Sequence, residues 1–443
     1  FDFRPGRFHT ETVINKASEW GKIANLLEYL LKQDISFILP SVVLSEKHGI
    51  HSFHRLRLES VREPLPVKKQ EKYNIVRWGS AGRDTIWKNT ACYKLFHLLK
   101  EKNNTTDLSW KELCFFWGSD FRTHIESKKD KKLYEDLSKR ISSLGKKAKK
   151  INQVKVPITK RLPFMDSEIQ VSKDDSFLFI KSKTMNITLN IKRGLAIESL
   201  IFNEISKNPL IGTLSQGYYE DIYFNVDHFS GHTIIEVPGL MKITDLHPIV
   251  PKFSSMLLPN GKRGITISCK VKTDYGTIEK SILIIPETSE LILSYNFYLQ
   301  SQFKKCSFRS GNLTFNPEAF DQENLFFACY NGGFKKDVFF LKEDTFNFSP
   351  ISVLCSARRV LGNTSGVLEI GDKQKTLFVE TDMKECAALP IIQFEKMSRS
   401  SSYFLRTQFS LEEFDDTVKV SESSYKKPIH LTLKITVKNK KYL

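Results

Sequence analysis

The sequence predicts a multidomain α+β protein in which an N-terminal helical bundle is followed by a large antiparallel β-sandwich. Up to about residue 153, apolar residues recur at steps of three and four, which is the period of an amphipathic helix. From about Val154 the period falls to two, and turn residues separate the alternating stretches, as in antiparallel strands. A chain of 443 residues is also too long for a single compact core, so we expect several domains.

Four stretches of the first part carry an apolar stripe at helical spacing. They are residues 17–31, 84–101, 107–117 and 133–144. None of these helices can bury its stripe alone, so we expect them to pack as a bundle. The apolar run of residues 35–39 is too short for a helix and is predicted to be a strand, whereas residues 52–76 are irregular around Pro64 and Pro66.

The second part alternates apolar and polar residues over short stretches. The clearest are residues 176–181, 185–191, 264–272 and 429–437. Turn sequences such as Pro259-Asn-Gly and Asp274-Tyr-Gly lie between stretches of this kind. Many short strands without intervening helices indicate an antiparallel sandwich, and the length of this part favours a many-stranded supersandwich over an immunoglobulin-like unit.

The net charge of +17 is concentrated in the first part of the chain. Residues 1–165 hold 33 Lys and Arg against 18 Asp and Glu, a balance of +15, whereas the remainder holds 34 against 32, or +2. Such an excess fits an anionic partner. Much of it lies in residues 128–150, however, and the alternative interpretation of this charge run is a helix face that only contacts water. Nucleic acid is disfavoured as a partner, because the chain lacks aromatic-basic interleaving, a helix-turn-helix and a zinc pattern.

The cysteines are scattered and odd in number, without a CxxC pair or metal-ligand spacing to a histidine. We therefore interpret them as small core residues in a reducing compartment, which predicts a cytoplasmic protein. No apolar run reaches the ~18 residues that span a bilayer. We expect neither a metal nor another cofactor. The cysteines are Cys92, Cys114, Cys269, Cys306, Cys329, Cys355 and Cys386.

Residues 113–125, called the aromatic segment below, carry the strongest functional pattern. Trp117 ends an apolar stretch, and Asp120, Arg122 and His124 follow at alternating positions. Alternation in extended backbone places these three side chains on one face, beside an aromatic ring. An acid, a cation and an imidazole near a Trp suit a polar ligand such as a sugar. The alternative is an Asp–Arg pair that ties a helix end to its neighbour.

Residues 73–84, called the glycine-rich segment below, form a second pattern. A short predicted strand ends in Arg77 and Trp78, small residues follow, and Arg83 and Asp84 precede a predicted helix. Small residues let backbone approach a ligand, and a helix N-terminus favours anions. The spacing matches neither a P-loop nor a dinucleotide fingerprint. Trp78 could stack on a sugar ring or belong to the core.

Two further patterns are weaker. Arg4, Arg7 and His9 flank a Pro-Gly turn that would present them together, and the alternative is a plain surface loop. Residues 212–232 are dense in Tyr, Asp and His, ending in His228 and His232. We interpret this stretch as lining a substrate or an inter-domain surface rather than a metal site, since no second ligand cluster accompanies it.

Taken in order, residues 4–9, 73–84, 113–125 and 193–236 resemble the downstream portion of proteins related to glycoside hydrolase family 57 that occur in polysaccharide gene clusters. The resemblance implies that residues 1–50 are the end of a β/α barrel. It also implies that residues 51–153 are a helical bundle with an irregular lead-in, and that residues 154–443 are a mutarotase-like supersandwich. In that family the catalytic carboxylates lie on barrel strands, so the resemblance places them upstream of Phe1.

The resemblance therefore implies a portion of a carbohydrate-active protein that binds a glycan and supports glycosidic-bond hydrolysis or transfer. The full-length protein would be the enzyme, and its catalytic residues are unknown. The alternatives are a non-catalytic carbohydrate-binding or polysaccharide-assembly protein and, less favoured, a basic nucleic-acid-binding protein. The sugar, the linkage and the oligomeric state stay open. The residues expected to contact the glycan are Arg4, Arg7, His9, Arg77, Trp78, Arg83, Asp84, Trp117, Asp120, Arg122 and His124.

Overall fold

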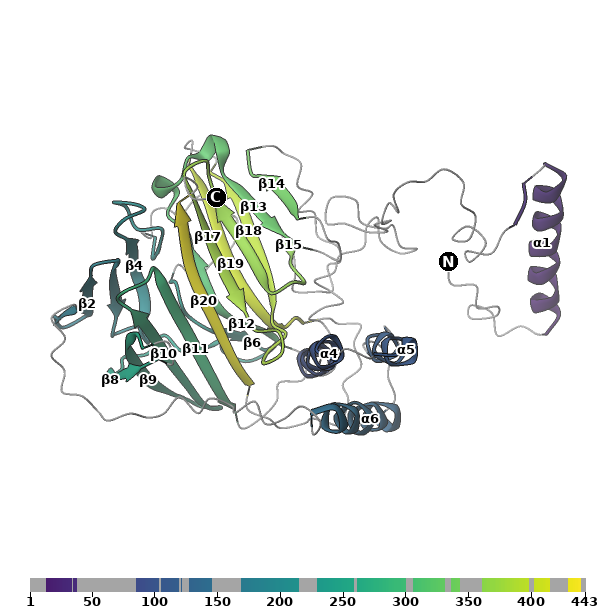
Figure 1. Cartoon of the computed structure of the whole chain (residues 1–443), viewed down its shortest axis with the longest axis horizontal. Coiled ribbons are helices and arrows are strands. Elements are labelled where there is room, and N and C mark those ends of the chain that lie inside the picture. Colours follow the sequence, from purple (N-terminus) through teal and green to yellow (C-terminus); the bar gives the residue numbers. More distant parts are fainter. Residues whose placement is uncertain are drawn as a thin grey trace. The chain divides into compact units, whose positions relative to one another are not determined.

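The structure, a computed structural model, is mostly antiparallel β-sheet with few helices (Figure 1). Its contacts divide the chain into two units, Phe1–Leu56 and Arg57–Leu443. Domain boundaries at residues 50 and 153 stay a prediction. The structure describes residues 13–33, 35–37, 85–102, 105–118, 121, 127–145, 169–214, 229–258, 261–299, 306–330, 336–342, 361–397, 402–414 and 429–439.

In the first unit, helix α1 (Val13–Lys32) contains the stripe predicted over residues 17–31. Residues 35–37 adopt no regular secondary structure, so the predicted strand does not form there. A strand needs a neighbour for its backbone N–H and C=O groups, and no described strand pairs with these residues. The predicted barrel remnant stays a prediction.

In the second unit, three helices confirm the remaining helical stripes: α4 (Thr85–Lys100), α5 (Asp107–Phe116) and α6 (Ser127–Gly145). We call them the helical cluster, because their apolar faces share one buried group of side chains that is separate from the core of the sheets. No helix in the described ranges is long and apolar enough to cross a membrane. The buried side chains of the helical cluster are Ala91, Cys92, Leu95, Leu99, Leu113, Phe116, Leu133, Leu137 and Leu144.

Residues 169–439, called the β-sheet region below, form three antiparallel sheets (Figure 1). The first holds β1 (Ile169–Lys173), β2 (Phe177–Ser182), β3 (Met185–Asn190), β4 (Ala196–Phe202) and β5 (Ile211–Gly212) in that order. The second runs β14 (Asp337–Phe340), β13 (Phe326–Cys329), β16 (Val367–Gly371), β17 (Lys375–Thr381), β20 (Ile429–Asn439), β11 (Glu290–Leu299), β10 (Gly276–Ile285), β9 (Arg263–Thr273) and β8 (Lys252–Leu257). The third runs β15 (Leu361–Gly362), β18 (Leu389–Lys396), β19 (Tyr403–Glu412), β12 (Ser307–Thr314), β6 (Ile234–Glu236) and β7 (Ile243–Thr244).

The stretches predicted to be strands are confirmed as β2, β3, β9 and β20. Strand β20 lies between β17 and β11, so it joins the two parts of the nine-stranded sheet. Short 3-10 helices η3 (Pro317–Ala319) and η4 (Gln322–Asn324) follow β12.

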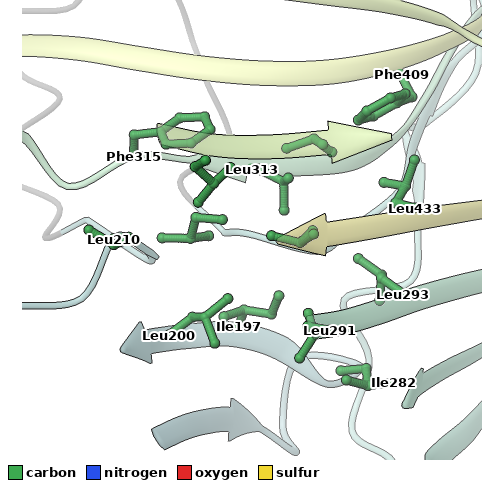
Figure 2. Close-up of a cluster of buried hydrophobic side chains, with 14 of the residues drawn as sticks. Ile197, Leu200, Leu210, Ile282, Leu291, Leu293, Leu313, Phe315, Phe409 and Leu433 are labelled. Carbon is green, nitrogen blue, oxygen red and sulfur yellow. The ribbon is translucent and has the colours of Figure 1, made fainter. Parts of the chain in front are cut away.

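One hydrophobic core joins the three sheets. Strand β11 shows how the sequence builds it, because its alternate side chains Leu291, Leu293, Tyr295 and Phe297 are buried while those between them are partly exposed. Figure 2 shows side chains from all three sheets pointing toward one another. The side chains labelled there are Ile197, Leu200, Leu210, Ile282, Leu291, Leu293, Leu313, Phe315, Phe409 and Leu433.

A buried ion pair interrupts this core. Lys280 occupies an inward position of β10, and its Nζ lies 3.0 Å from Asp245 Oδ2 and donates to the Gly194 carbonyl at 2.7 Å. Both charged side chains are fully buried, and Asp245 Oδ1 accepts the Thr233 N–H at 2.8 Å. Burial also raises the pKa of the neighbouring Tyr295 well above its ordinary value, and the Asp245 charge adds to that rise. The pair therefore ties the loops at residues 194 and 245 to the large sheet.

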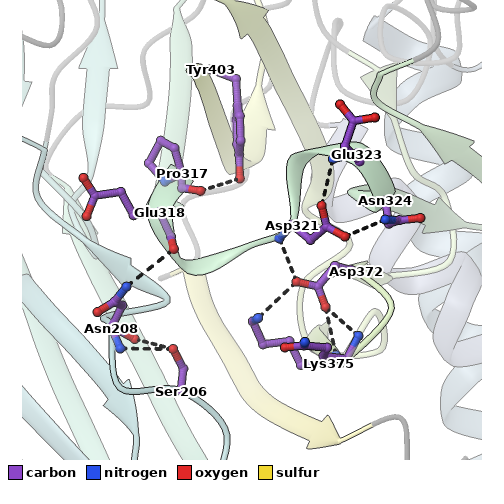
Figure 3. A network of polar contacts seen from close by, with 11 residues as sticks. Ser206, Asn208, Pro317, Glu318, Asp321, Glu323, Asn324, Asp372, Lys375 and Tyr403 are labelled. Atoms are coloured by element: carbon purple, nitrogen blue, oxygen red, sulfur yellow. Dashed lines mark hydrogen bonds and ion pairs between the residues drawn. The ribbon is translucent and has the colours of Figure 1, made fainter. Parts of the chain in front are cut away.

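A second polar network fixes the turn between β16 and β17 against the start of η4 (Figure 3). The Asp372 carboxylate accepts backbone N–H groups of Asp321 at 3.0 Å, Gln374 at 2.8 Å and Lys375 at 3.0 Å. It also lies 3.0 Å from Lys375 Nζ. Burial alone raises the pKa of Asp372, but these hydrogen bonds outweigh it and hold the pKa below the ordinary value of 3.8.

Asp372 is therefore expected to make stability depend on pH. Because its folded pKa is depressed, its contribution is complete above the unfolded pKa and is lost as the pH falls through the folded pKa. Urea unfolding of the wild type and of Asp372→Asn, measured from pH 7 to pH 2, checks this. The difference in unfolding free energy is expected to be constant above about pH 5 and to shrink below the ordinary carboxyl pKa. A difference that is the same at every pH would rule out the carboxylate charge as its source.

Candidate functional site

The glycan-contacting residues predicted from the sequence fall mostly outside the described ranges. Trp117 is described, and the other ten are not: Arg4, Arg7, His9, Arg77, Trp78, Arg83, Asp84, Asp120, Arg122 and His124. Described residues next to these positions in the sequence show how the ends of the two segments are held.

Trp117 caps the C-terminal end of α5, where its backbone N–H donates to the Leu113 carbonyl at 3.0 Å. Its half-buried ring makes a T-shaped contact with the ring of Tyr93, with the centroids 5.1 Å apart and the planes perpendicular. Tyr93 belongs to α4, and its hydroxyl donates to the Thr364 carbonyl in the β-sheet region at 2.6 Å. Burial, with a smaller effect of Cys92, raises the pKa of Tyr93 to about 12, which keeps this donor protonated.

Lys88 connects the aromatic segment to the first turns of α4. Its Nζ donates to the Phe121 carbonyl at 2.9 Å and lies 2.6 Å from Asp130 Oδ1 of α6. The side chains of Lys88 and Asp130 are only 2% and 1% exposed, so the pair is sheltered from water. Phe121 is also fixed by its N–H, which donates to the Gly118 carbonyl at 3.2 Å, and by an edge contact with Phe115.

This arrangement has a consequence for the two sequence segments. The glycine-rich segment ends at Asp84, directly before the first residue of α4, and Phe121 lies within the aromatic segment. The Lys88–Phe121 hydrogen bond therefore joins the aromatic segment to the same end of α4 that the glycine-rich segment leads into.

Lys88 and Asp130 were not among the predicted residues, although a signal was present. Lys88 lies three and four positions before Ala91 and Cys92, on the buried stripe of α4. A lysine on an apolar stripe needs a buried partner, and the acidic partner comes from a helix separated from it in sequence. Tyr93 was missed because its role depends on a contact with Thr364, far along the chain.

Helix α4 also contacts the β-sheet region. Thr90 and Tyr93 lie one turn apart on its surface. Thr90 Oγ1 accepts the Ala387 N–H at 2.9 Å, in the loop between β17 and β18, and Tyr93 reaches Thr364 near β15. The helix that carries Lys88 is thus fixed directly to the sheets.

Of the stretch predicted over residues 212–232, the structure describes residues 212–214 and 229–232. His232 is buried, and its Nε2 lies 3.3 Å from Arg406 Nη2. Arginine can only donate, so this nitrogen is the acceptor and the proton resides on Nδ1. The His232 carbonyl accepts from Asn312 Nδ2 at 2.9 Å, and Gln408 donates to Asn312 Oδ1 at 2.6 Å. His232 therefore belongs to a polar network across β12 and β19.

Two chemical properties of the site follow. The Lys88 and Asp130 charges neutralise each other, so this buried pair adds no net charge beside the Phe121 carbonyl, whereas the lysines next to Asp130 on α6 are exposed. Within the described parts of the chain, no three His, Cys, Asp or Glu side chains gather at metal-binding distance. A half-buried Trp beside fixed backbone suits stacking against a flat, polar ligand face.

No family model matches the chain, and no curated protein sequence matches it. Among solved structures, it is similar to a galactose mutarotase-like protein from Clostridium acetobutylicum, with 10% identity over 61% of this chain and 98% of that chain and a TM-score of 0.35. It is similar to an α-mannosidase from Enterococcus faecalis, with 6% identity over 62% of this chain and 30% of that chain and a TM-score of 0.36. It is also similar to 4-α-glucanotransferase from Thermococcus litoralis, with 8% identity over 80% and 50% and a TM-score of 0.23. With TM-scores below 0.5, function has to be argued from the residues.

Proposed function

We propose that the chain is part of a carbohydrate-active protein and binds a glycan where the glycine-rich and aromatic segments meet, at the N-terminal end of α4. The observation that carries the proposal is the Lys88–Phe121 hydrogen bond, held by the buried Asp130. It fixes the carbonyl of Phe121, which lies between Trp117 and His124 in the part of the sequence with the strongest sugar-binding pattern. The resemblance of both segments to glycoside hydrolase family 57-related proteins supports the same ligand class.

In this proposal each residue type has a defined task. The Trp rings stack on sugar faces, the arginines donate to ring oxygens and hydroxyls, and the carboxylates accept from hydroxyls. The β-sheet region, proposed to be a mutarotase-like supersandwich, serves as the scaffold that fixes α4 through Thr90 and Tyr93. In the second unit the proposed contacts are Arg77, Trp78, Arg83, Asp84, Trp117, Asp120, Arg122 and His124. Arg4, Arg7 and His9 belong to the first unit and stay separate predicted contacts.

The proposed role is to hold a glycan while glycosidic-bond hydrolysis or transfer occurs. That chemistry requires two carboxylates on either side of the bond. We assign neither carboxylate to a residue of this chain. A non-catalytic role in polysaccharide assembly uses the same binding site and differs only in the absence of bond cleavage.

A glycan array probed at low and at physiological salt tests the proposal. Selective binding is expected to persist at both salt concentrations, because sugar recognition relies on stacking and hydrogen bonds, whereas nucleic-acid binding falls steeply with salt. Trp117→Ala and Asp120→Ala are expected to weaken binding about tenfold or more, a loss of at least ~1.4 kcal/mol. Leu108→Ala, which removes an exposed side chain from α5, is the matched control and is expected to bind like the wild type.

Two results would refute the proposal. One is the absence of binding to any glycan. The other is binding that disappears at physiological salt and is indifferent to Trp117→Ala, which would identify a polyanion ligand.

A further inference from the structure

The outer face of the nine-stranded sheet carries a continuous line of small hydroxyl side chains. Ser268, Ser281, Ser294 and Thr432 face one another in register on the adjacent strands β9, β10, β11 and β20. We call these four residues the hydroxyl row. All four are partly exposed, and the buried residues that alternate with them face the core. With strands ~4.8 Å apart, the row extends about 14 Å across the sheet.

His430 lies beside the hydroxyl row in a fixed orientation. Its Nδ1 is 2.7 Å from Asn296 Oδ1, and its Nε2 is 2.8 Å from Thr432 Oγ1. The Asn296 oxygen can only accept, so Nδ1 is assigned the proton and, in the neutral ring, Nε2 accepts from the Thr432 hydroxyl. The Glu385 carboxylate lies 3.8 Å from the same Nε2, and both side chains are well exposed, at 41% for His430 and 55% for Glu385.

The charges next to the hydroxyl row cancel in pairs. Lys270 lies 3.1 Å from Glu279 on one side, and Lys434 lies 2.9 Å from Glu290 on the other. Around the row, the surface presents hydroxyl, amide and imidazole groups, and the two ion pairs on either side add no net charge to it. Its chemistry complements a neutral polyhydroxyl ligand rather than a polyanion.

This surface adjoins the helix of the proposed glycan site. Glu385 lies two residues before Ala387, whose N–H donates to Thr90 of α4 at 2.9 Å. One loop, residues 382–388, thus touches His430 on the sheet and α4 in the helical cluster. A ligand that extends from the N-terminal half of α4 would meet His430 and then the hydroxyl row.

The composition of the row also argues for more than a solvated face. Asn is depleted in strands, yet Asn296 is placed in β11, well inside the sheet, where it orients His430. Within the described ranges, the hydroxyls of Ser268 and Ser281 donate to no neighbouring side chain, so they remain available to a ligand.

We propose that His430, Asn296 and the hydroxyl row form a second subsite for a neutral oligosaccharide, which continues from the site at α4. This inference rests on the proposed glycan binding. The row's hydroxyls exchange hydrogen bonds with successive sugar hydroxyls, Asn296 donates through its amide nitrogen, and His430 presents its ring edge. Short glycans occupy the α4 site alone, and longer glycans occupy both.

Titration of the full chain with neutral oligosaccharides from disaccharide to hexasaccharide tests the proposal. Affinity is expected to rise with length in the wild type by about tenfold or more. Ser281→Val replaces a hydroxyl in the middle of the row with an apolar side chain that is favourable in a strand, and His430→Ala removes the imidazole. Both substitutions are expected to abolish the increase in affinity with oligosaccharide length. Thr436→Ala, on the same face but outside the row, is the control and is expected to keep it. Oligosaccharides of the same lengths that contain uronic acid are expected to gain less.

The NMR signals of the His430 ring in the wild-type protein provide a readout that needs no substitution. They are expected to shift with the longer oligosaccharides and not with the disaccharide. Binding that depends on Trp117 but leaves the His430 signals and the Ser281→Val affinity unchanged would overturn the second subsite alone. No binding of any oligosaccharide would overturn both proposals.

Discussion

Replacing Asp245 with asparagine is expected to lower the free energy of unfolding of the β-sheet region by about 3–5 kcal/mol. The substitution keeps the size of the side chain and an oxygen for the Thr233 N–H, but it removes the negative charge beside Lys280. The ammonium of Lys280 then stays fully buried with the Gly194 carbonyl and the Tyr295 ring beside it, neither of which carries a negative charge. An uncompensated buried charge is among the most costly single changes in a protein interior.

A double substitution separates the charge from the packing at this position. Lys280→Met in the Asp245→Asn background removes the unpaired charge and keeps an apolar chain of similar length, so most of the lost stability is expected to return. Urea unfolding followed by circular dichroism measures all three proteins. Glu279→Gln, which breaks the exposed Lys270 pair on the same sheet, is the control and is expected to cost less than about 1 kcal/mol. Equal losses for Asp245→Asn and Glu279→Gln would contradict the argument from burial.

Lys88→Met is the second change with a large expected effect, because it acts on both stability and binding. It leaves the buried Asp130 carboxylate without its cation and is expected to destabilise the helical cluster by about 3–5 kcal/mol. It also removes the donor that holds the Phe121 carbonyl, so glycan binding is expected to fall about tenfold or more.

The double variant Lys88→Met, Asp130→Leu distinguishes these two effects. Without a buried charge, the cluster is expected to regain most of its stability, but the Phe121 carbonyl still lacks its donor and glycan binding is expected to stay weak. Lys94→Met, at an exposed position of the same helix, serves as the control for both measurements. A stable double variant that binds glycans like the wild type would show that Lys88 does not position the aromatic segment.

The periodicity of the sequence was sufficient to predict most of the regular elements. Helices α4 to α6 and strands such as β9 and β20 follow directly from steps of three to four or two. A strand was predicted over residues 35–39, and this prediction was wrong for residues 35–37, the part that the structure describes. An apolar run indicates a strand only where another strand can pair with it. The order of the strands in each sheet could not be predicted, since alternation within a strand does not show which other strands pair with it.

The same limit applies to the site residues. Lys88 and Lys280 each interrupt an apolar pattern, which indicates that each needs a buried acidic partner. Their partners Asp130 and Asp245 lie far from them in the sequence, and periodicity does not show which distant residues meet. The hydroxyl row could not be recognised from the sequence, because its members come from four strands and become neighbours only through the pairing register of those strands. For the ten predicted contacts outside the described ranges, glycan binding remains a proposal.

The place of β20 in the nine-stranded sheet bears on the synthesis of this protein. Strands β8 to β11 and strands β13, β14, β16 and β17 are joined to each other in the sheet only through β20. A nascent chain that ends before residue 429 therefore carries two open edges, at β11 and at β17, whose N–H and C=O groups lack the strand that pairs with them. The two parts of the sheet can join only after β20 has been synthesised, so the incomplete chain is the form most prone to aggregation through its open edges.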